Sequence, residues 1–292
     1  MINWFYLADT NMDLVSLKTF QAVVEEGGIL AASRKLNTVQ SNVTTRIRKL
    51  EEELGTELFF RKGRGVELAP SGRVLLDYSR RMLLLQRQTE AAIRQVGESV
   101  GQIRLGAFDT FAGLHLPRGM KALKAAFPKL DVHVETGNSG KLIKQVLDHQ
   151  LDAAFVAGPV NHPELDFEEI IVEELVMVLA KGTDPVQSPL ILFHEGCAYR
   201  PRALAFQKTL GHALSDAMTF GTLEGIFGCV SVGLGWTLMP RRAVEKSAYR
   251  DEFEVRSIPA EYAMVPTGLV RLKDSLPLPA LKAITATVGN GQ

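Results

Sequence analysis

The stretch "NTVQSNVTTRIRKLEEELG" (Asn37 to Gly55) separates two kinds of residue along one predicted helix. Apolar residues recur at steps of three and four, the spacing of a single buried stripe: Val43, Ile47, Leu50, Leu54 and Leu58. The other face opens with amide, hydroxyl and guanidinium side chains: Gln40, Ser41, Asn42, Thr44, Thr45, Arg46 and Arg48. The carboxylates Glu51, Glu52 and Glu53 come only afterwards. Such a helix keeps negative charge away from its start.

Two shorter helical patterns precede this helix. An amphipathic pattern begins at Asp13 and stops at Gly27-Gly28, and "LAASRKL" (Leu30 to Leu36) follows it. Asn37-Thr38 breaks the chain, and Asn37 with Gln40 three residues later resembles a capping box, so we expect the next helix to restart there. Helix, tight turn and helix on an apolar core form a helix-turn-helix, whose second helix enters the DNA major groove by its N-terminal end.

The polar residues of the second helix suit the reading of base edges. Glutamine and asparagine pair with adenine, arginine pairs with guanine, and threonine meets hydrogen-bonding groups or a thymine methyl. We therefore predict DNA contacts from all seven polar residues named above, from Gln40 to Arg48. The alternative is that this is an ordinary solvated helix face.

A basic hairpin follows the helix. In "RKGRGVELAPSG" (Arg61 to Gly72), glycines between bases and the alternation of Val66, Glu67 and Leu68 predict a short β-ribbon wing. Arg61, Lys62 and Arg64 would contact phosphates there. From Arg34 to Arg64, eight lysines and arginines face four glutamates, which gives this segment a charge of +4 in a chain of formal net charge +0.

A long helix is predicted from Pro70-Ser71 to about Gly97. Apolar residues at alternating steps of three and four form a coiled-coil seam that begins with Leu75, Tyr78, Met82 and Leu85. A seam this narrow would be exposed to water in a monomer, so we predict that it makes a homodimer. The alternative is that the seam packs against its own chain.

The remaining residues alternate between strands and helices. Strands are predicted at Ile103–Ala107, Val132–Thr136, Asp152–Ala157, Leu175–Ala180, Leu190–Phe193 and Thr267–Leu272, with a buried strand ending at Pro240. Helices are predicted at Leu116–Phe127, Gly140–His149, Arg202–Leu210 and Leu223–Val232. This alternation indicates an α/β fold, with two lobes, that binds ligands at the carboxyl ends of its strands.

Loops after these strands hold candidate contacts to a small effector. The candidates are Thr110, Ser139, Tyr199, Arg200 and Thr222. Hydroxyls at helix starts, together with Arg200, favour an anionic metabolite. The alternative for each hydroxyl is a plain N-cap.

Motifs for catalysis and for metal binding are missing from the sequence. The six histidines have no metal-ligand spacing, and no nucleophile elbow or P-loop is present, so we expect neither an enzyme nor a metal or cofactor. "MINWFYLADT" (Met1 to Thr10) is not a secretory signal, and the 16 uncharged residues of Gly225–Pro240 are too few to span a membrane. Cys197 and Cys229 form no CxxC motif, which indicates a reducing compartment such as the cytoplasm. We expect the thiol of Cys197 to be unreactive. Residues 1–11 have no predicted role.

From Met12 onward the chain resembles the LysR-type transcriptional regulators. The resemblance rests on the block from "LKTFQAVVEEGG" (Leu17 to Gly28) to "ELFFRKGRG" (Glu57 to Gly65), on "PSGRVLLDYSRRML" (Pro70 to Leu83) and on "GLGWTLMP" (Gly233 to Pro240). It implies a winged helix-turn-helix, a linker helix that dimerises, and a two-lobed effector domain like a periplasmic binding protein. Gln40 and Arg61 match family DNA-contact positions, and Thr110, Ser139, Tyr199 and Thr222 fall near the effector cleft.

The domain boundaries and partners follow from this resemblance. We expect a DNA-binding domain at 12–70, a linker helix at 71–97 and an effector domain at 98–292, with lobe I at about 98–170 and 266–292 and lobe II at about 171–265. The implied partners are promoter DNA, a small effector, further copies of the chain up to a tetramer, and RNA polymerase. The chain departs from the family at Val39, where a serine is usual, and at Ser41, Thr45 and Ala69.

Two other classes of function remain as alternatives at this point. In a solute-binding or sensor protein the α/β lobes would carry the binding function, and the N-terminal helices would only form oligomers. An enzyme on the α/β fold would need a catalytic constellation that the sequence lacks.

Overall fold

A computed structural model describes residues 12–62, 65–95, 101–211, 217–275 and 278–289. The chain divides into two compact units, Met1–Ile93 and Arg94–Gln292. Within the described ranges, no helix is both long enough and apolar enough to cross a membrane.

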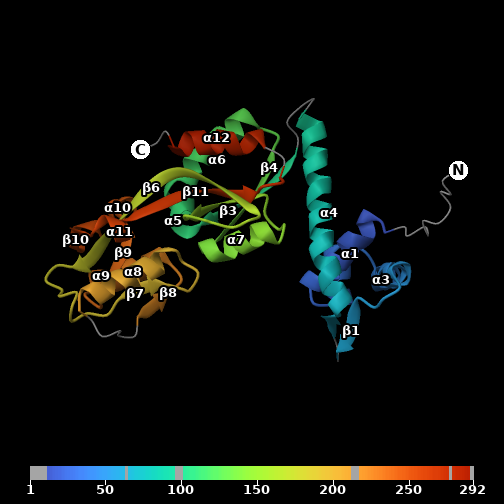
Figure 1. The fold of residues 1–292 in the computed structure, drawn as a ribbon, viewed down its shortest axis with the longest axis horizontal. Helices are drawn as coiled ribbons and strands as arrows, with labels where there is room; N and C mark the ends of the chain where they lie inside the picture. Colours follow the sequence, from blue (N-terminus) through green and yellow to red (C-terminus); the bar gives the residue numbers. More distant parts are fainter. Residues whose placement is uncertain (1–11, 63–64, 96–100, 212–216, 276–277, 290–292) are drawn as a thin grey trace. The chain divides into compact units, whose positions relative to one another are not determined.

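The N-terminal unit is a winged helix-turn-helix with a long helix attached (Figure 1). Its elements are α1 Leu14–Glu25, α2 Ile29–Lys35, α3 Gln40–Leu54, β1 Phe59–Lys62, β2 Gly65–Leu68 and α4 Pro70–Gln95. Asp13 caps α1 by accepting a 2.6 Å hydrogen bond from the amide of Ser16. The stripe of α3 is buried at Val43, Ile47 and Leu50, and it shares a core with Phe20 of α1. The predicted helices and the β-ribbon are confirmed.

The turn between α2 and α3 differs from the prediction. Asn37 does not cap α3; it ends α2 in the left-handed conformation, with φ of 50°. The amides of Asn37 and Thr38 donate to the carbonyls of Arg34 and Ser33, at 3.1 and 2.9 Å, which is a Schellman motif. The N-cap of α3 is Val39, which has no side-chain acceptor. The predicted capping box is therefore wrong, because Asn37 is needed where few residues tolerate positive φ.

One residue of the predicted seam on α4 belongs to the core of its own chain. Leu75 is only 8% exposed and packs with the helix-turn-helix. For Leu75 the alternative prediction, that the seam packs against its own chain, is confirmed. The amide of Gln21 also donates to Ser79, at 3.2 Å, which ties α1 to α4. The other predicted seam residues, Tyr78, Met82 and Leu85, are exposed, and Val74 takes the place of Leu75 in the exposed stripe.

Mixed β-sheet forms the centre of the C-terminal unit (Figure 1). Paired strands follow the order β10, β6, β11, β5, β3, β4, and β9 also pairs with β6. Their bounds are β3 Gln102–Phe108, β4 Asp131–Gly137, β5 Ala153–Ala157, β6 Leu165–Ala180, β9 Trp236–Pro240, β10 Phe253–Ser257 and β11 Met264–Leu272. Strand β3 pairs in parallel with β4 and β5, whereas β11 runs antiparallel to β5 and β6.

Helices and a short second sheet complete this unit. The helices are α5 Asp109–Leu114, α6 Leu116–Ala126, α7 Ser139–Leu147, α8 Tyr199–Thr209, α9 Leu223–Ser231, α10 Arg241–Glu245, α11 Ala260–Ala263 and α12 Pro279–Gly289, with a 3₁₀ turn at Arg250–Glu252. Strands β7 Ile191–Phe193 and β8 Met218–Phe220 pair in parallel. Every strand and helix predicted in this region is found, and β8, β10, α5, α10, α11 and α12 are additional.

Strand β6 is much longer than predicted and joins the two lobes. Its first part, through Glu174, pairs with β11, and from Leu175 onward it pairs with β9 and β10. The first part was not predicted because four glutamates and an aspartate interrupt its apolar alternation. The lobes therefore share a continuous strand, and its change of partners marks the passage from one lobe to the other.

Replacing Asn37 by alanine tests the turn. Because a side chain at positive φ costs roughly 1–2 kcal/mol, Asn37→Ala should lower the free energy of unfolding of the N-terminal unit by about 1 kcal/mol. Asn37→Gly should leave it nearly unchanged, since glycine tolerates this conformation. Urea denaturation measures both variants. Equal losses in the two would show that the side chain of Asn37, and not its backbone, matters.

Candidate functional site

The polar face of α3 is presented to solvent. Gln40, Ser41, Asn42, Thr45, Arg46 and Arg48 are exposed, and Thr44 is half-buried. The first turn contains no acidic residue, and no side chain caps the helix. The side-chain amide of Asn42 donates to the hydroxyl of Thr38, at 3.1 Å. The start of α3 therefore offers backbone amides, an amide side chain and hydroxyls on one surface, which suits a polyanion.

Two of the basic residues counted in the sequence, Lys35 and Lys49, are paired with acids in the structure. Lys35 lies 2.7 Å from Glu25 and 3.0 Å from Glu26, and its hydrogen bond to Glu25 raises its pKa. Lys49 pairs with Glu53 at 3.6 Å. Arg34, Arg46 and Arg48 make no ion pair with any acid in the described part of the chain. Arg64 and the side chains of Arg61 and Lys62 lie outside the described residues.

Glu51 has a structural function that the sequence did not indicate. Its carboxylate accepts hydrogen bonds from the amides of Leu58 and Phe59, at 2.8 and 3.4 Å. The acid at the end of α3 thus fixes the entry into the β1–β2 hairpin. Glu51 therefore lies at the end of α3 for a structural reason, in addition to keeping its carboxylate away from DNA phosphates.

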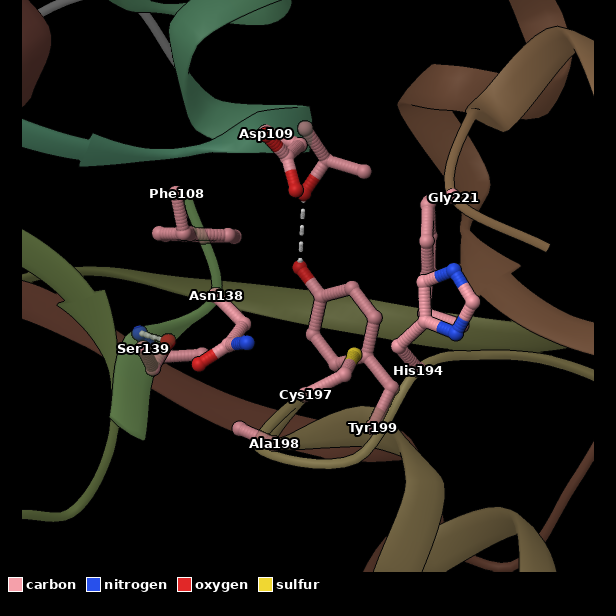
Figure 2. Close-up of a pocket in the computed structure, with 12 residues that line it drawn as sticks. Phe108, Asp109, Asn138, Ser139, His194, Cys197, Ala198, Tyr199 and Gly221 are labelled. Carbon is pink, nitrogen blue, oxygen red and sulfur yellow. Dashed lines mark hydrogen bonds between the residues drawn. The ribbon is translucent and has the colours of Figure 1, made fainter. Parts of the chain in front are cut away.

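A second candidate site is a small cavity between the lobes of the C-terminal unit (Figure 2). Its volume is about 80 Å³, and three of the five predicted effector residues line it: Thr110, Ser139 and Tyr199. Asp109, Asn138, His194 and Cys197 also line it, and Phe108 and Phe193 supply aromatic walls. A wider cavity of about 500 Å³ shares Asp109, Thr110 and Gly221 with it.

The other two predicted residues have structural partners. Thr222 is the N-cap of α9 and accepts from the amide of Gly225 at 3.1 Å, which is the plain N-cap given as the alternative. Thr222 also lines the wider cavity. Arg200 donates to the carbonyl of Phe193 at 2.9 Å and does not line the small cavity. The guanidinium therefore holds a loop of its own lobe.

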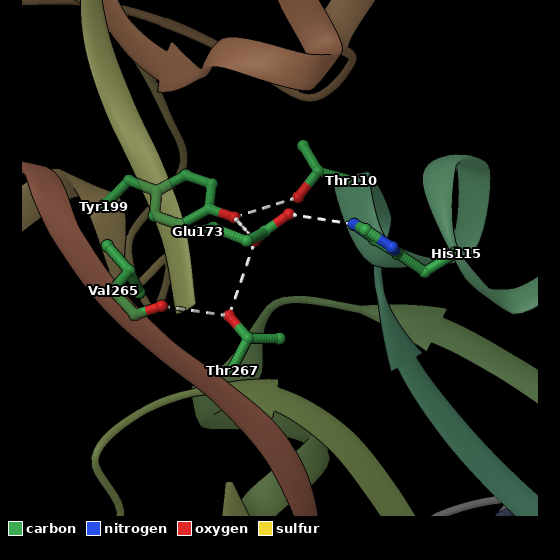
Figure 3. A network of polar contacts seen from close by, with 6 residues as sticks. All are labelled: Thr110, His115, Glu173, Tyr199, Val265 and Thr267. Carbon is green, nitrogen blue, oxygen red and sulfur yellow. Dashed lines mark hydrogen bonds and ion pairs between the residues drawn. The ribbon is translucent and has the colours of Figure 1, made fainter. Parts of the chain in front are cut away.

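Behind the cavity lies a buried polar network centred on Glu173 (Figure 3). The hydroxyl of Tyr199 donates to one carboxyl oxygen of Glu173 at 2.8 Å, and Thr267 lies 3.4 Å from the same oxygen. The Nε2 atom of His115 lies 3.2 Å from the other oxygen. The hydroxyl of Thr110 lies 3.1 Å from that of Tyr199. All five residues are buried.

This network decides what the cavity hydroxyls can still do. Because Tyr199 gives its proton to Glu173, Thr110 must donate to Tyr199, and the oxygen of Thr110 keeps lone pairs for a ligand. Ser139 accepts from the amide of Ala157 at 3.1 Å, so its own proton remains available. The cavity therefore offers an acceptor at Thr110 and a donor at Ser139.

Burial changes the titration of three groups at the cavity. It raises the pKa of Tyr199 well above the ordinary value, and the neighbouring Glu173 adds to the shift, so Tyr199 stays a neutral donor. Burial also raises the pKa of Cys197, which keeps its thiol protonated and weakly nucleophilic. Desolvation raises the pKa of Asp109.

Sequence reasoning missed Asp109, Asn138, His194, His115 and Glu173. Asn138 and Asp109 stand beside predicted residues in "GNSGK" (Gly137 to Lys141) and "FDTF" (Phe108 to Phe111), which was a usable signal. Glu173 had none, because its partners lie 26 to 94 residues away in sequence. Among the described residues, no group of three or more histidine, cysteine or acidic side chains could hold a metal ion.

Two family models together match nearly the whole chain. Residues 14–73 match the bacterial regulatory helix-turn-helix protein, lysR family, and residues 97–291 match the LysR substrate binding domain. The chain belongs to the LysR family. It is thus a LysR-type transcriptional regulator with a substrate-binding domain.

Curated LysR regulators are similar over almost their full lengths. The HTH-type transcriptional regulator YofA of Bacillus subtilis (strain 168) is 38% identical over 266 residues, which cover 90% of this chain and 93% of YofA. GltR of the same organism is 34% identical over 279 residues, covering 93% of this chain and 94% of GltR.

Solved LysR-family structures share the fold. A full-length OxyR variant from Pseudomonas aeruginosa matches with a TM-score of 0.70 at 20% identity, covering 95% of this chain and 98% of that one. CbnR complexed with its target DNA matches with a TM-score of 0.67 at 21% identity, covering 96% and 100%. The predicted order, a helix-turn-helix followed by a two-lobed α/β domain, is confirmed.

Removing the hydroxyl of Tyr199 tests the network in this LysR regulator. Tyr199→Phe leaves the buried carboxyl of Glu173 without its shortest hydrogen bond, which should cost about 1–3 kcal/mol in the free energy of unfolding of the C-terminal unit. Tyr262→Phe is the matched control, because Tyr262 is only half-buried and should change stability by less than about 0.5 kcal/mol. Urea denaturation of both variants gives the comparison. Equal losses would mean that the network adds no stability.

Proposed function

We propose that this LysR regulator binds promoter DNA through α3 and the β1–β2 hairpin, and that a small effector in the interlobe cavity modulates it. The supporting observation is the exposed polar face of α3, which carries amides, hydroxyls and two arginines on a helix without acids in its first turn. CbnR, a solved structure of similar fold, is bound to its target DNA. A protein that acts on promoter DNA works in the cytoplasm, with RNA polymerase as a further partner.

Each part of the DNA surface has its own function in this proposal. Gln40 and Asn42 read adenine, Arg46 and Arg48 read guanine or contact phosphates, and the hydroxyls of Ser41, Thr44 and Thr45 complete the surface. The hairpin residues Arg61, Lys62 and Arg64 contact phosphates and add affinity without sequence choice. Residues 12–70 would form this domain, 71–97 the linker and 98–292 the effector domain.

The interlobe cavity favours a neutral or positively charged effector over the anion expected from the sequence. The helix-start amides that would receive an anion are already bonded: Gly140 donates to Gly196 at 3.2 Å and Lys141 to Asn138 at 2.8 Å. Asp109 adds a carboxyl group, and the described lining includes no lysine or arginine. We expect a small molecule that donates to Asp109 and Thr110 and accepts from Ser139.

Dimerisation through α4 is the third part of the proposal. Tyr78, Leu85 and Val74 are 53%, 59% and 60% exposed, and Met82 is 37% exposed. They follow one another at steps of four, four and three on one helix face, so a second copy of α4 would cover them. A dimer also presents two recognition helices to two half-sites, and two dimers would make the expected tetramer.

Replacing Gln40 by alanine tests the DNA reading. Against an operator selected from random duplexes, Gln40→Ala should lose about 1–3 kcal/mol of binding free energy, because a base contact is removed. Binding to random duplex should change little, since phosphate contacts remain. Titrations of both duplexes across a salt series measure the two effects. Equal losses on both duplexes would exclude Gln40 from base reading.

Two glutamates on the α4 stripe test the dimer. Met82→Glu with Leu85→Glu should convert dimers to monomers, because the interface would bury unpaired charges. Met82→Leu with Leu85→Met keeps the surface apolar and should preserve the dimer. Light scattering at matched concentrations decides between them. Dimers that survive the glutamates would place the interface elsewhere.

A further inference from the structure

The cavity lies between two contacts that join the lobes, and they differ in burial. The inner contact is the bond between Thr110 and Tyr199, which are 4% and 3% exposed. The outer contact joins the start of α7 to the loop before α8, at Asn138 and Gly140 on one side and Glu195 and Gly196 on the other. Asn138 and Cys197, which directly follows Gly196, both line the cavity (Figure 2).

Two hydrogen bonds form the outer contact. The side-chain amide of Asn138 donates to the carbonyl of Glu195 at 3.1 Å, and the amide of Gly140 donates to the carbonyl of Gly196 at 3.2 Å. The oxygen of Asn138 separately accepts from the amide of Lys141 at 2.8 Å, which caps α7. One side chain therefore caps its own helix with its oxygen and bonds the opposite lobe with its nitrogen.

Gly196 fits this contact for two reasons. Its φ of 87° lies where side chains are strained, and a Cβ atom there would lie 2.5 Å from the oxygen of Asn138. At Gly140, by contrast, a Cβ atom would lie 3.5 Å from the Cα atom of Gly196, which is ordinary van der Waals contact. The outer contact therefore requires the absence of a side chain at Gly196 in particular.

Water can replace the outer contact but not the inner one. Gly140, Glu195 and Gly196 are exposed, so each group would find water when the outer bonds break. Separating Thr110 from Tyr199 would instead disturb the buried carboxyl of Glu173, whose other partners are His115 and Thr267. Unpaired buried polar groups are costly, whereas exposed ones are not.

We propose that Asn138, Gly140, Glu195 and Gly196 form a latch that closes the interlobe cavity. The lobes part at this latch, and the Thr110–Tyr199–Glu173 contact stays closed as the pivot. Helix α7 keeps its cap when the latch opens, because Asn138 bonds Lys141 through a different atom. The assignment of the cavity to the effector rests on the proposed function, whereas the opening of the latch can be measured without any effector.

Cys197 serves as a built-in reporter of the opening. Its thiol lines the cavity and is partly buried, so a thiol reagent such as N-ethylmaleimide reacts with it faster when the latch is open. Cys229→Ala removes the second thiol from the full-length protein. Rates are taken at several pH values, so that a change in the pKa of Cys197 is separated from a change in access.

Gly196→Ala and Gly182→Ala form a matched pair. Both glycines have positive φ, 87° and 80°, but a Cβ atom at Gly182 has no neighbour within 4 Å. Both variants carry the same kind of backbone strain, and only Gly196→Ala pushes against Asn138. We expect Gly196→Ala to speed the labelling of Cys197 and Gly182→Ala to leave it at the wild-type rate.

Asn138→Asp opens the latch without removing the cap. Aspartate still accepts from the amide of Lys141, but it cannot donate to the carbonyl of Glu195. Labelling should accelerate about three- to tenfold, the effect of losing one net hydrogen bond between neutral groups. Because helix capping is retained, this variant decides the matter if Gly196→Ala does not fold.

The outcomes for the latch and for the effector site are distinct. Wild-type labelling rates in Asn138→Asp, or equal rates in Gly196→Ala and Gly182→Ala, would overturn the latch. A metabolite that changes operator binding but does not protect Cys197 from N-ethylmaleimide would overturn the effector site and leave the latch intact. Protection of Cys197 in the wild type, with faster labelling in both latch variants, supports the two proposals together.

Discussion

A carboxyl group buried at the junction of two lobes constrains everything packed around it. Glu173 is 6% exposed and lies on β6 just before that strand changes partners. Because an unpaired buried carboxyl would be costly, His115, Tyr199 and Thr267 must stay within reach of it. These residues come from the α5–α6 junction, α8 and β11, so one side chain fixes elements of both lobes.

The same constraint separates fixed parts from movable ones. The inner contact, between Thr110 and Tyr199, belongs to the buried network, whereas Gly140, Glu195 and Gly196 of the outer contact are exposed. An effector can shift the regulator only if it binds one arrangement of the lobes better than another. The difference in burial between the inner and the outer contact gives the two arrangements a physical basis.

The fold was largely predictable because its signals are local. The stripe of α3 and the alternation of β3 and β4 are visible over a few residues. Asn37 was misread because its preference for helix starts and its tolerance of positive φ predict different structures. The first half of β6 was missed because its glutamates face solvent or the buried network. The sites were only half predictable: Thr110, Ser139 and Tyr199 line the cavity, but Arg200 bonds a carbonyl of its own lobe.

Val39 has an energetic consequence of its own. Valine at the N-cap of α3 has no side-chain acceptor, and a missing side-chain cap lowers helix stability by about 0.5–2 kcal/mol. The free protein therefore leaves the first amides of α3 to water, although a one-residue change would satisfy one of them. In the proposed complex a DNA phosphate takes that place. In that complex, stability forgone in the isolated domain would become affinity for the operator, because folding and recognition would use the same few hydrogen-bond donors.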